Sequence, residues 1–299
     1  MKRTCRLLGV IAIVLAANPA FAQQTKSVRI ATWNMAWLTD RMPGTGGEGG
    51  VPANVHHRSK ADWALVRKYA KLLNADIVAF EEVDGIEAAK KAYGDKYNFH
   101  TTDEPDVQKP GFAIRKGIVF TPNPDFADLD VIADQPRSLR RGADITVELA
   151  GQKIRMLAVH LKSGCPRQPL ETPTGGNCPL LKQQLPILAR WIKDRVDEKV
   201  PFIVLGDFNR SFEDHETFWL GMNLDGKAGL VRSTAEHTSK CWGGAHPDFI
   251  DHIVFGGRAR QWIDNSSFQV LVYDETDPSF QNRISDHCPQ YMTLKVKKP

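Results

Sequence analysis

Residues 201–209 read Pro-Phe-Ile-Val-Leu-Gly-Asp-Phe-Asn, an apolar run that ends in an acidic and an amide side chain. The uncharged run predicts a buried strand. Asp207 and Asn209 follow it with one residue between them, so both side chains can point to the same face. An Asx turn after a buried strand is the purely structural alternative. The stretch predicts a sheet whose strand ends carry polar groups.

Other apolar runs end in the same way. Residues 28–34 end at Asn34, residues 76–80 are followed by Glu81 and Glu82, and residues 154–159 are followed by His160. Residues 249–255 form a further run that carries Asp251 inside it, and the last polar group is the tripeptide Ser-Asp-His at 285–287. Because strand ends can hold distant residues around one point, these segments predict a common site.

Two amphipathic helices are predicted between the strands. Residues 62–73 place Trp63, Val66 and Leu73 on one face, with Asp62 suited to the first turn. Residues 181–196 repeat the pattern, and Pro186 is expected to bend that helix or delay its start. Strand pairs without a helix between them favour two mostly antiparallel sheets packed face to face and flanked by helices. No internal repeat is visible in the sequence.

The segments, taken in order, resemble the endonuclease/exonuclease/phosphatase superfamily, which includes pancreatic-type deoxyribonuclease. The resemblance runs from Ile30 to Leu294. Each motif is weak alone, but five in the family's order, each near a predicted strand, are strong. The resemblance implies a four-layer α/β/β/α sandwich and an exported, bacterial-type member of the family.

The resemblance also implies a metal end of the site. Glu82 would be the principal Mg²⁺ ligand, and Asn34 and Asp286 would complete the coordination directly or through water. Mn²⁺ or Ca²⁺ could replace Mg²⁺. The structural alternatives are a solvated carboxylate, a strand-end cap and a turn residue. Glu81 stands where the family usually has glutamine, and it should face away from Glu82 because adjacent strand side chains alternate.

Five residues are expected to carry the chemistry. Asp207 would orient or deprotonate the attacking water while Asn209 donates to phosphate oxygens. His287, with Asp251 fixing its tautomer, would contact the phosphate or act as base, and His160 would protonate the leaving oxygen or stabilise the pentacovalent phosphate. A histidine after a strand is more often structural, but two at one locus favour catalysis. His252 should face the other way.

A local cluster of basic residues could bind substrate phosphate. A solvated face is the alternative. The candidates are Arg115, Arg137, Arg140, Arg141 and Lys162.

The N-terminus predicts an export signal over residues 1–22. Three basic residues precede an apolar stretch, and Ala20-Phe21-Ala22 has the form of a cleavage site. A membrane anchor is the alternative, but the stretch is short for a bilayer. Removing the segment lowers the formal charge from +4 to +1. Net charge therefore gives no argument for nucleic-acid binding by the whole surface, and only a local basic patch could support it.

Cysteine usage is consistent with export. The chain beyond the signal keeps Cys165, Cys178, Cys241 and Cys288, enough for two disulfides in an oxidising compartment. Cys165 and Cys178 bracket a loop with little apolar content, which a bridge would stabilise, and Cys241 with Cys288 is the remaining pair. Free thiols or a zinc site are alternatives, although no CxxC pair is present.

With 299 residues and 42% apolar content, the chain could form one α/β domain or two. We expect one, over residues 23–299, because site motifs extend from Asn34 to His287 without a Pro/Ser-rich linker. The sequence predicts a monomeric, Mg²⁺-dependent phosphodiesterase, periplasmic or secreted and not inserted in a membrane, that cleaves DNA or RNA. A sphingomyelinase-like enzyme or nucleotide phosphatase is the second hypothesis, and a catalytically idle envelope binding protein is the third.

Overall fold

The computed structural model of the chain describes residues 25–46, 50–135, 138–171 and 177–298. The predicted signal segment, residues 1–22, and Arg137 lie outside these ranges.

The first of two sheets has six strands with one parallel pair. Strands β1 and β2 pair in parallel, and all the other neighbours pair antiparallel. In sheet order the strands are β11 (Gln269–Val270), β12 (Gln290–Lys297), β1 (Thr25–Leu38), β2 (Ile77–Val83), β4 (Lys109–Arg115) and β3 (Tyr97–Thr101).

The second sheet is also six-stranded. Strands β7 and β8 form its parallel pair, and the rest pair antiparallel. In sheet order the strands are β5 (Val119–Pro122), β6 (Ala143–Leu149), β7 (Gln152–His160), β8 (Phe202–Asp207), β10 (Asp251–Gly256) and β9 (Val231–Arg232).

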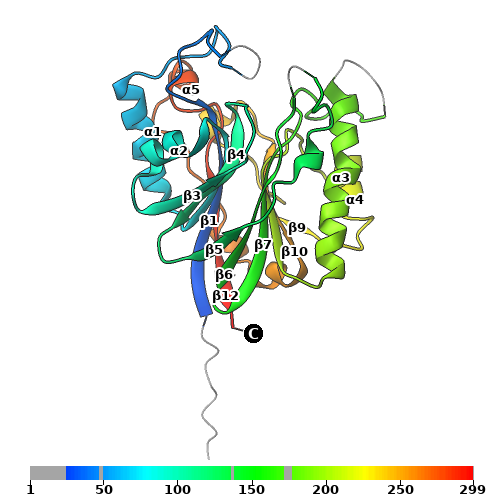
Figure 1. Cartoon of the computed structure of the whole chain (residues 1–299). Coiled ribbons are helices and arrows are strands. Elements are labelled where there is room, and N and C mark those ends of the chain that lie inside the picture. The colour runs from blue at the N-terminus through cyan, green and yellow to red at the C-terminus, as the bar shows by residue number, and fades with distance from the viewer. Residues whose placement is uncertain (1–24, 47–49, 136–137, 172–176, 299) are drawn as a thin grey trace, which may run out of the picture.

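Helices cover the outer faces of both sheets, which confirms the predicted four-layer sandwich (Figure 1). Helices α1 (Lys60–Leu73) and α2 (Gly85–Tyr93) pack on the first sheet, and α3 (Asn177–Asp197) and α4 (Thr217–Met222) on the second. The shorter elements are α5 (Phe280–Arg283), η1 (Ala127–Leu129), η2 (Cys241–Gly244), η3 (Gly257–Trp262) and η4 (Asn265–Ser267).

Three apolar clusters hold the layers together. The cluster between the sheets includes Ile30, Phe112, Met156 and Phe255, all fully buried. The two outer clusters lie under α1 and α2 and under α3 and α4. Burial of this kind stabilises by roughly 25 cal/mol per Å² of apolar surface, so the sheet faces position the strand ends firmly.

The two predicted helices are present, with earlier starts than expected. Ser59 caps α1 and forms a capping box with Asp62, while Asn74 ends the helix in the left-handed conformation. Helix α3 begins at Asn177 and continues through Pro186. The expected delay at Pro186 was therefore wrong. Leu181, Leu188 and Ile192 are fully buried, and this packing outweighs the missing backbone donor.

The chain contains a repeated topology that its sequence does not show. Four adjacent strands of the first sheet run β1-β2-β4-β3, and four adjacent strands of the second run β7-β8-β10-β9. Helix α1 connects the first parallel pair and α3 connects the second. The two halves therefore present equivalent strand ends to each other.

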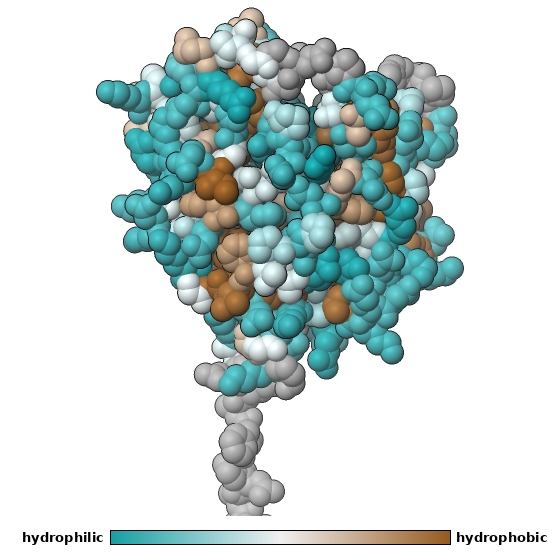
Figure 2. Space-filling model, in the orientation of Figure 1, coloured by the Kyte–Doolittle hydropathy of each residue, from teal (hydrophilic) through white to brown (hydrophobic). Residues whose placement is uncertain are grey.

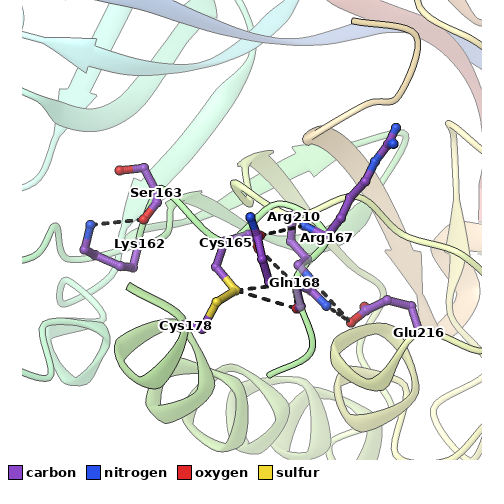
Figure 3. Close-up of a disulfide and its surroundings, with 8 residues drawn as sticks. All are labelled: Lys162, Ser163, Cys165, Arg167, Gln168, Cys178, Arg210 and Glu216. Carbon is purple, nitrogen blue, oxygen red and sulfur yellow. Dashed lines mark hydrogen bonds and ion pairs between the residues drawn. A yellow bond between two sulfur atoms is a disulfide. The ribbon is translucent and has the colours of Figure 1, made fainter. Parts of the chain in front are cut away.

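Two disulfides are present, and both match the predicted pairs. Cys165 is bonded to Cys178, and Cys241 to Cys288. In Figure 3 Arg210 reaches the first bridge, donating to the carbonyl oxygens of Cys165 and Gln168 and pairing with Glu216. The bridge fixes the loop after β7 to the start of α3, and Arg210 fixes the same loop to the segment after β8.

The face of the molecule in Figure 2 is mostly hydrophilic, with separate small apolar patches. Among the described residues, no helix has the length and apolar character needed to cross a membrane.

Candidate active site

Strands of both sheets deliver polar residues to one end of the sandwich. His160 ends β7 and pairs with Asp207 at the end of β8, and Asp251 at the start of β10 also pairs with Asp207. Asn34 lies near the end of β1 beside Glu81 on β2. In Figure 1 the loops that follow β1 and β7 lie at this end, opposite the C-terminus.

Gly206 allows the strands to come this close. A Cβ atom at this position would lie 2.1 Å from the Val159 carbonyl oxygen and 2.9 Å from Oε1 of Glu81. Its φ of +136° also favours glycine. Glycine at this position lets the end of β8 approach the first sheet.

Asp207 lies at the centre of the site. Its Oδ2 accepts hydrogen bonds from the amide nitrogens of Asn34 at 3.0 Å and Asn209 at 3.1 Å. The Nε2 atoms of His160 and His287 are 3.7 Å and 4.0 Å from the same oxygen. Burial and the charge of Asp251 raise the pKa of Asp207 to about 7.

Asp251 holds the imidazole of His287. The two side chains are joined by a 2.8 Å hydrogen bond between Oδ2 and Nδ1. Burial alone would lower the pKa of His287, but the charge and hydrogen bond of Asp251, with the charges of Asp207 and Asp286, raise it well above 6.5. These carboxylates therefore favour the protonated form of the His287 imidazole.

Ser285 connects His287 to the first sheet. Its hydroxyl accepts from the backbone nitrogen of His287 at 2.9 Å and donates to the carbonyl oxygen of Asn34 at 2.7 Å. The histidine loop is thus fixed to the end of β1.

Glu82 lies near the end of β2, beside Asn34 and Trp37. Its Oε1 accepts from the amide nitrogen of Asn34 at 3.2 Å and its Oε2 accepts from the backbone nitrogen of Trp37 at 3.0 Å. Glu82 and Asn209 both have positive φ, a conformation that costs free energy and is common at functional sites. Asn34 Oδ1 accepts from the Ala36 nitrogen at 3.0 Å. The amide nitrogen of Asn34 therefore faces the carboxylates.

The donor set suits a hard divalent cation. Glu82 and Asp286 supply carboxylate oxygens, and Asp286 is exposed beside His287. One ligand atom each from Asp207, Asp251 and His287 lie within 4.8 Å of one another, and Oδ1 of Asp251 is buried without a hydrogen-bond partner in the described chain. Carboxylate-rich sites of this kind hold Mg²⁺, Mn²⁺ or Ca²⁺.

His160 is buried and electrically neutral. Its Nε2 lies 3.6 Å from Oε1 of Glu82. Burial, followed by the positive charges of Arg140 and His287, lowers its pKa well below 6.5. A neutral imidazole here can donate a hydrogen bond without adding charge.

Two cations lie next to His160. Arg140 donates to the Leu161 carbonyl oxygen at 3.2 Å, while its Nε is buried without a partner in the described chain. Figure 3 shows Lys162 turned to the carbonyl oxygen of Ser163 at 3.0 Å. Burial and the charge of Arg140 lower the pKa of Lys162. Within the described ranges neither cation pairs with a carboxylate, so both can receive an anion.

The other predicted basic residues are placed differently. Arg141 donates to the carbonyl oxygen of Asp103 at 2.8 Å. Arg115 binds Asp76 at 2.9 Å beside the start of β2, at the opposite end of the strand from Glu82. The structure does not bring Arg115 to the other candidate site residues, because the antiparallel pairing of β4 with β2 directs the end of β4 away from them.

Asn209 also differs from expectation. Its amide nitrogen donates to the carbonyl oxygen of Leu161 and to Asp207, which uses both amide hydrogens. Asn209 thus holds Asp207 in place. His252 faces away, as predicted, and bonds Thr234 and the carbonyl oxygen of Arg210.

Glu81 lies directly beneath the site. It is fully buried, with Thr32 as its hydrogen-bonding neighbour at 3.4 Å. Burial, then the charges of Asp251 and Asp207, raise the pKa of Glu81 well above 4.5. A neutral Glu81 supports the carboxylates above it without repelling them.

Sequence reasoning missed Arg58 and Gln290. Arg58 sits at the end of a Gly/Pro-rich loop and bonds carbonyl oxygens, so no residue pattern identifies it. Gln290 follows Ser-Asp-His by three positions and donates to the carbonyl oxygen of Asp251 at 3.0 Å. A polar residue opening an otherwise alternating strand was the available signal.

A pocket of about 260 Å³ adjoins His287 and Asp286. Its walls include Trp242, Phe249 and the Cys241–Cys288 bridge. The pocket leaves space for a ligand group beside His287.

Comparison with known proteins identifies the fold and the family. The model of the Endonuclease/Exonuclease/phosphatase family matches residues 31–287. No curated protein matches the sequence.

Solved structures with the same fold share little sequence. TDP2 of Caenorhabditis elegans superposes with a TM-score of 0.59 and 13% identity over 90% of this chain and 98% of that one. TDP2 of D. rerio, complexed with single strand DNA product, gives 0.58 and 17% over 90% and 99%. A mannosyl-6-phosphatase of Bacteroides thetaiotaomicron gives 0.53 and 15% over 90% and 99%.

Proposed function

Because the chain belongs to the Endonuclease/Exonuclease/phosphatase family, we propose that it is a metal-dependent phosphodiesterase that cleaves nucleic acid. Membership gives the reaction class, which is hydrolysis of phosphoester bonds. The metal identity, the nucleic acid and the individual residue roles are our proposal.

One observation carries the proposal. Glu82, Asn34, Asp207, His287 and Asp251 form an unbroken series of side-chain contacts across the two sheets, with separations from 2.8 to 4.0 Å. This series combines hard oxygen ligands with the imidazole of His287, and the second imidazole, His160, lies beside it, 3.6 Å from Glu82 and 3.7 Å from Asp207. A module that only binds has no need for these groups together.

The metal would lie on the Glu82 side, with Asp286 close by and Asn34 holding Glu82 and Asp207 in place. We favour this position over Asp207, Asp251 and His287 because the Glu82 side chain is 14% exposed, against 2% for Asp207, and Mg²⁺ keeps several of its waters. Bound Mg²⁺ would neutralise charge on the phosphate.

Asp207, whose pKa of about 7 is suited to proton transfer, would orient the attacking water and accept its proton. Asn209 keeps Asp207 in the required orientation. The His287 imidazolium would donate to a phosphate oxygen, and neutral His160 would donate to the phosphate or to the leaving oxygen. The base could instead be His287 once an ion has lowered its pKa.

A polyanionic substrate is supported by Arg140 and Lys162, which have no described carboxylate partner and lie beside His160. The TDP2 relative crystallised with a DNA product acts as precedent for such a substrate on this fold. The mannosyl-6-phosphatase neighbour supports a second candidate, a phosphomonoesterase with a sugar in the pocket beside His287. A sphingomyelinase-like activity is a third.

We also propose that residues 1–22 are a cleaved export signal and that residues 23–299 form one domain in the periplasm or medium. The two disulfides support an oxidising compartment. We expect the exported protein to be a monomer.

The decisive experiment compares hydrolysis of plasmid DNA, RNA, sphingomyelin, a sugar phosphate and bis(p-nitrophenyl) phosphate by the mature protein. Each is assayed with Mg²⁺, with EDTA, and with Glu82→Ala and His287→Ala. Nucleic-acid cleavage that is lost in EDTA and in both variants supports the proposal. Turnover of the lipid or the sugar phosphate alone replaces it with the corresponding alternative, and no turnover at all rejects catalysis in favour of binding.

A further inference from the structure

Arg58 joins two distant parts of the chain through its guanidinium group. Nε donates to the carbonyl oxygen of Arg283 at 3.1 Å, and Nη1 donates to that of Trp37 at 2.7 Å. Nη2 donates to the carbonyl oxygens of Met35, Ala36 and Ile284, at 3.0, 2.7 and 3.0 Å. The side chain therefore holds five carbonyl groups from two segments.

The two segments lead directly to the two sides of the candidate active site. Residues 35–37 follow Asn34, and Trp37 also donates to Glu82. Residues 283–284 precede Ser285, which bonds both Asn34 and His287. Any shift at Arg58 would move the Glu82 side and the His287 side relative to each other.

The local backbone requires such a clamp. Ala36 and Trp37 have φ values of 45° and 53°, in the left-handed region that non-glycine residues avoid. Their carbonyl oxygens are turned toward Arg58 instead of continuing the strand pairing. The guanidinium stabilises this conformation because each unpaired buried carbonyl would cost free energy.

Arg58 is a buried charge without a carboxylate partner. Only 3% of the residue is exposed, and within the described ranges it forms no ion pair. Burial lowers its pKa to about 10, while the nearby charges of Asp62 and Glu82 oppose that change. Arginine carries five N–H donors in a fixed planar fork, which matches the five carbonyl oxygens bonded here.

We infer that Arg58 is a positioning residue that sets the geometry between the metal side and the His287 side, acting through residues 35–37 and 283–284 without touching substrate. This inference rests on the proposed function for its catalytic consequence. Its structural consequence, coupled order in the two segments, is independent of any substrate.

The test compares Arg58→Met and Arg58→Lys with Arg115→Met. Arg115 is the matched control because it also fixes backbone and side-chain groups, but at the opposite end of the first sheet. Lysine keeps the charge but offers a single nitrogen, so it can serve only part of the carbonyl set.

Three measurements are made on protein that remains folded by near-ultraviolet circular dichroism. Hydrogen exchange should accelerate in residues 34–38 and 283–287 together. Mn²⁺ affinity, measured by calorimetry, should fall about tenfold in Arg58→Met, and kcat should fall about 100-fold with KM little changed. Arg58→Lys should lie between wild type and Arg58→Met, added guanidinium ion should partly restore Arg58→Met, and Arg115→Met should match wild type.

Exchange that increases evenly over the first sheet, with Mn²⁺ affinity and kcat unchanged, would show a general stabilising role and overturn the inference. Faster hydrogen exchange in only one of the two segments, 34–38 or 283–287, would also overturn the inference. Should Arg58→Met fail to fold, Arg58→Lys is read by the same criteria. A wild-type protein that hydrolyses nothing would refute the proposed function, whereas the exchange measurement would still decide the role of Arg58.

Discussion

The two halves of the molecule have the same strand order but contribute different chemistry. In the first half, β1-β2-β4-β3, strands β1 and β2 carry Asn34 and Glu82 near their ends. In the second half, β7-β8-β10-β9, the equivalent strands end in His160 and Asp207. Shared topology explains why all four meet at one place.

The halves differ in exposure. The Glu82 side chain is 14% exposed, compared with 3% for His160 and 2% for Asp207. An accessible carboxylate suits an ion that keeps several of its waters. Buried groups keep altered pKa values, as for Asp207 and His160. The topology sets where the groups lie, and burial sets what each can do.

The largest expected effect tests the second half. Asp207→Asn keeps the shape but removes the proton acceptor, so kcat at saturating Mg²⁺ should fall about 1,000-fold. The Mg²⁺ concentration for half-maximal rate should stay close to wild type. A large rise in that concentration would instead put the ion beside Asp207, Asp251 and His287, and the division between the halves would be wrong.

The next effect tests the first half. Glu82→Gln should raise the Mg²⁺ concentration for half-maximal rate by about 10- to 100-fold, because an amide oxygen is a weaker ligand than a carboxylate. A titration of rate against Mg²⁺ measures this. Unchanged Mg²⁺ dependence in Glu82→Gln would contradict the metal position.

A smaller effect is expected from a comparison of the loops that follow β1 and β7. Arg58 holds the first, while the Cys165–Cys178 bridge, with 13 residues of separation, holds the second. Replacing both cysteines with serine should lower the free energy of unfolding by about 3 kcal/mol, measured in urea. The Mg²⁺ dependence should not change. A change like that of Glu82→Gln would mean that both loops position the metal.

The smallest expected effect is a pH dependence of the unfolding temperature, measured in EDTA. Raised pKa values of Asp207 and His287 mean that the folded state keeps protons that the unfolded state has lost. For Asp207 that stability is lost as pH rises from 3.8 to about 7, and for His287 it is lost above 6.5. The unfolding temperature in EDTA should therefore fall between pH 6.5 and about pH 8.

Glu104 also has its pKa raised to about 7, so it too makes the unfolding temperature fall as pH rises. The contribution of Asp207 is therefore measured as the difference between wild type and Asp207→Asn in how steeply the unfolding temperature falls with pH. The fall should be shallower in Asp207→Asn. If the unfolding temperature fell equally steeply with pH in the two proteins, Asp207 would not contribute to this pH dependence. The lowered pKa of His160 acts in the opposite direction, but only below 6.5.

Much of this arrangement could be predicted from the sequence. The apolar runs at 28–34, 76–80, 154–159, 201–205 and 249–255 all lie in or overlap observed strands. Apolar runs are informative because buried central strands tolerate few polar residues. Short edge strands such as β9 and β11, with two residues each, lack that signal. The topological repeat was invisible because it consists of strand order and not of matching residues.

Within the site, the sequence predicted positions better than contacts. The disulfide pairs and the turning away of His252 agree with expectation. The amide orientation of Asn34 and the clamp by Arg58 could not be predicted, because both depend on backbone groups that every residue has. Arg115 was misplaced because antiparallel pairing reverses the end at which a strand finishes.

Both ends of the described chain lie on the side away from the active site. Thr25 pairs with Lys297, and the C-terminus in Figure 1 is opposite the loops that follow β1 and β7. A tag or tether added after the last strand would therefore leave the candidate active site facing the medium. The protein is suited to immobilisation through its C-terminus on a solid support, with phosphoester substrates free to reach that site.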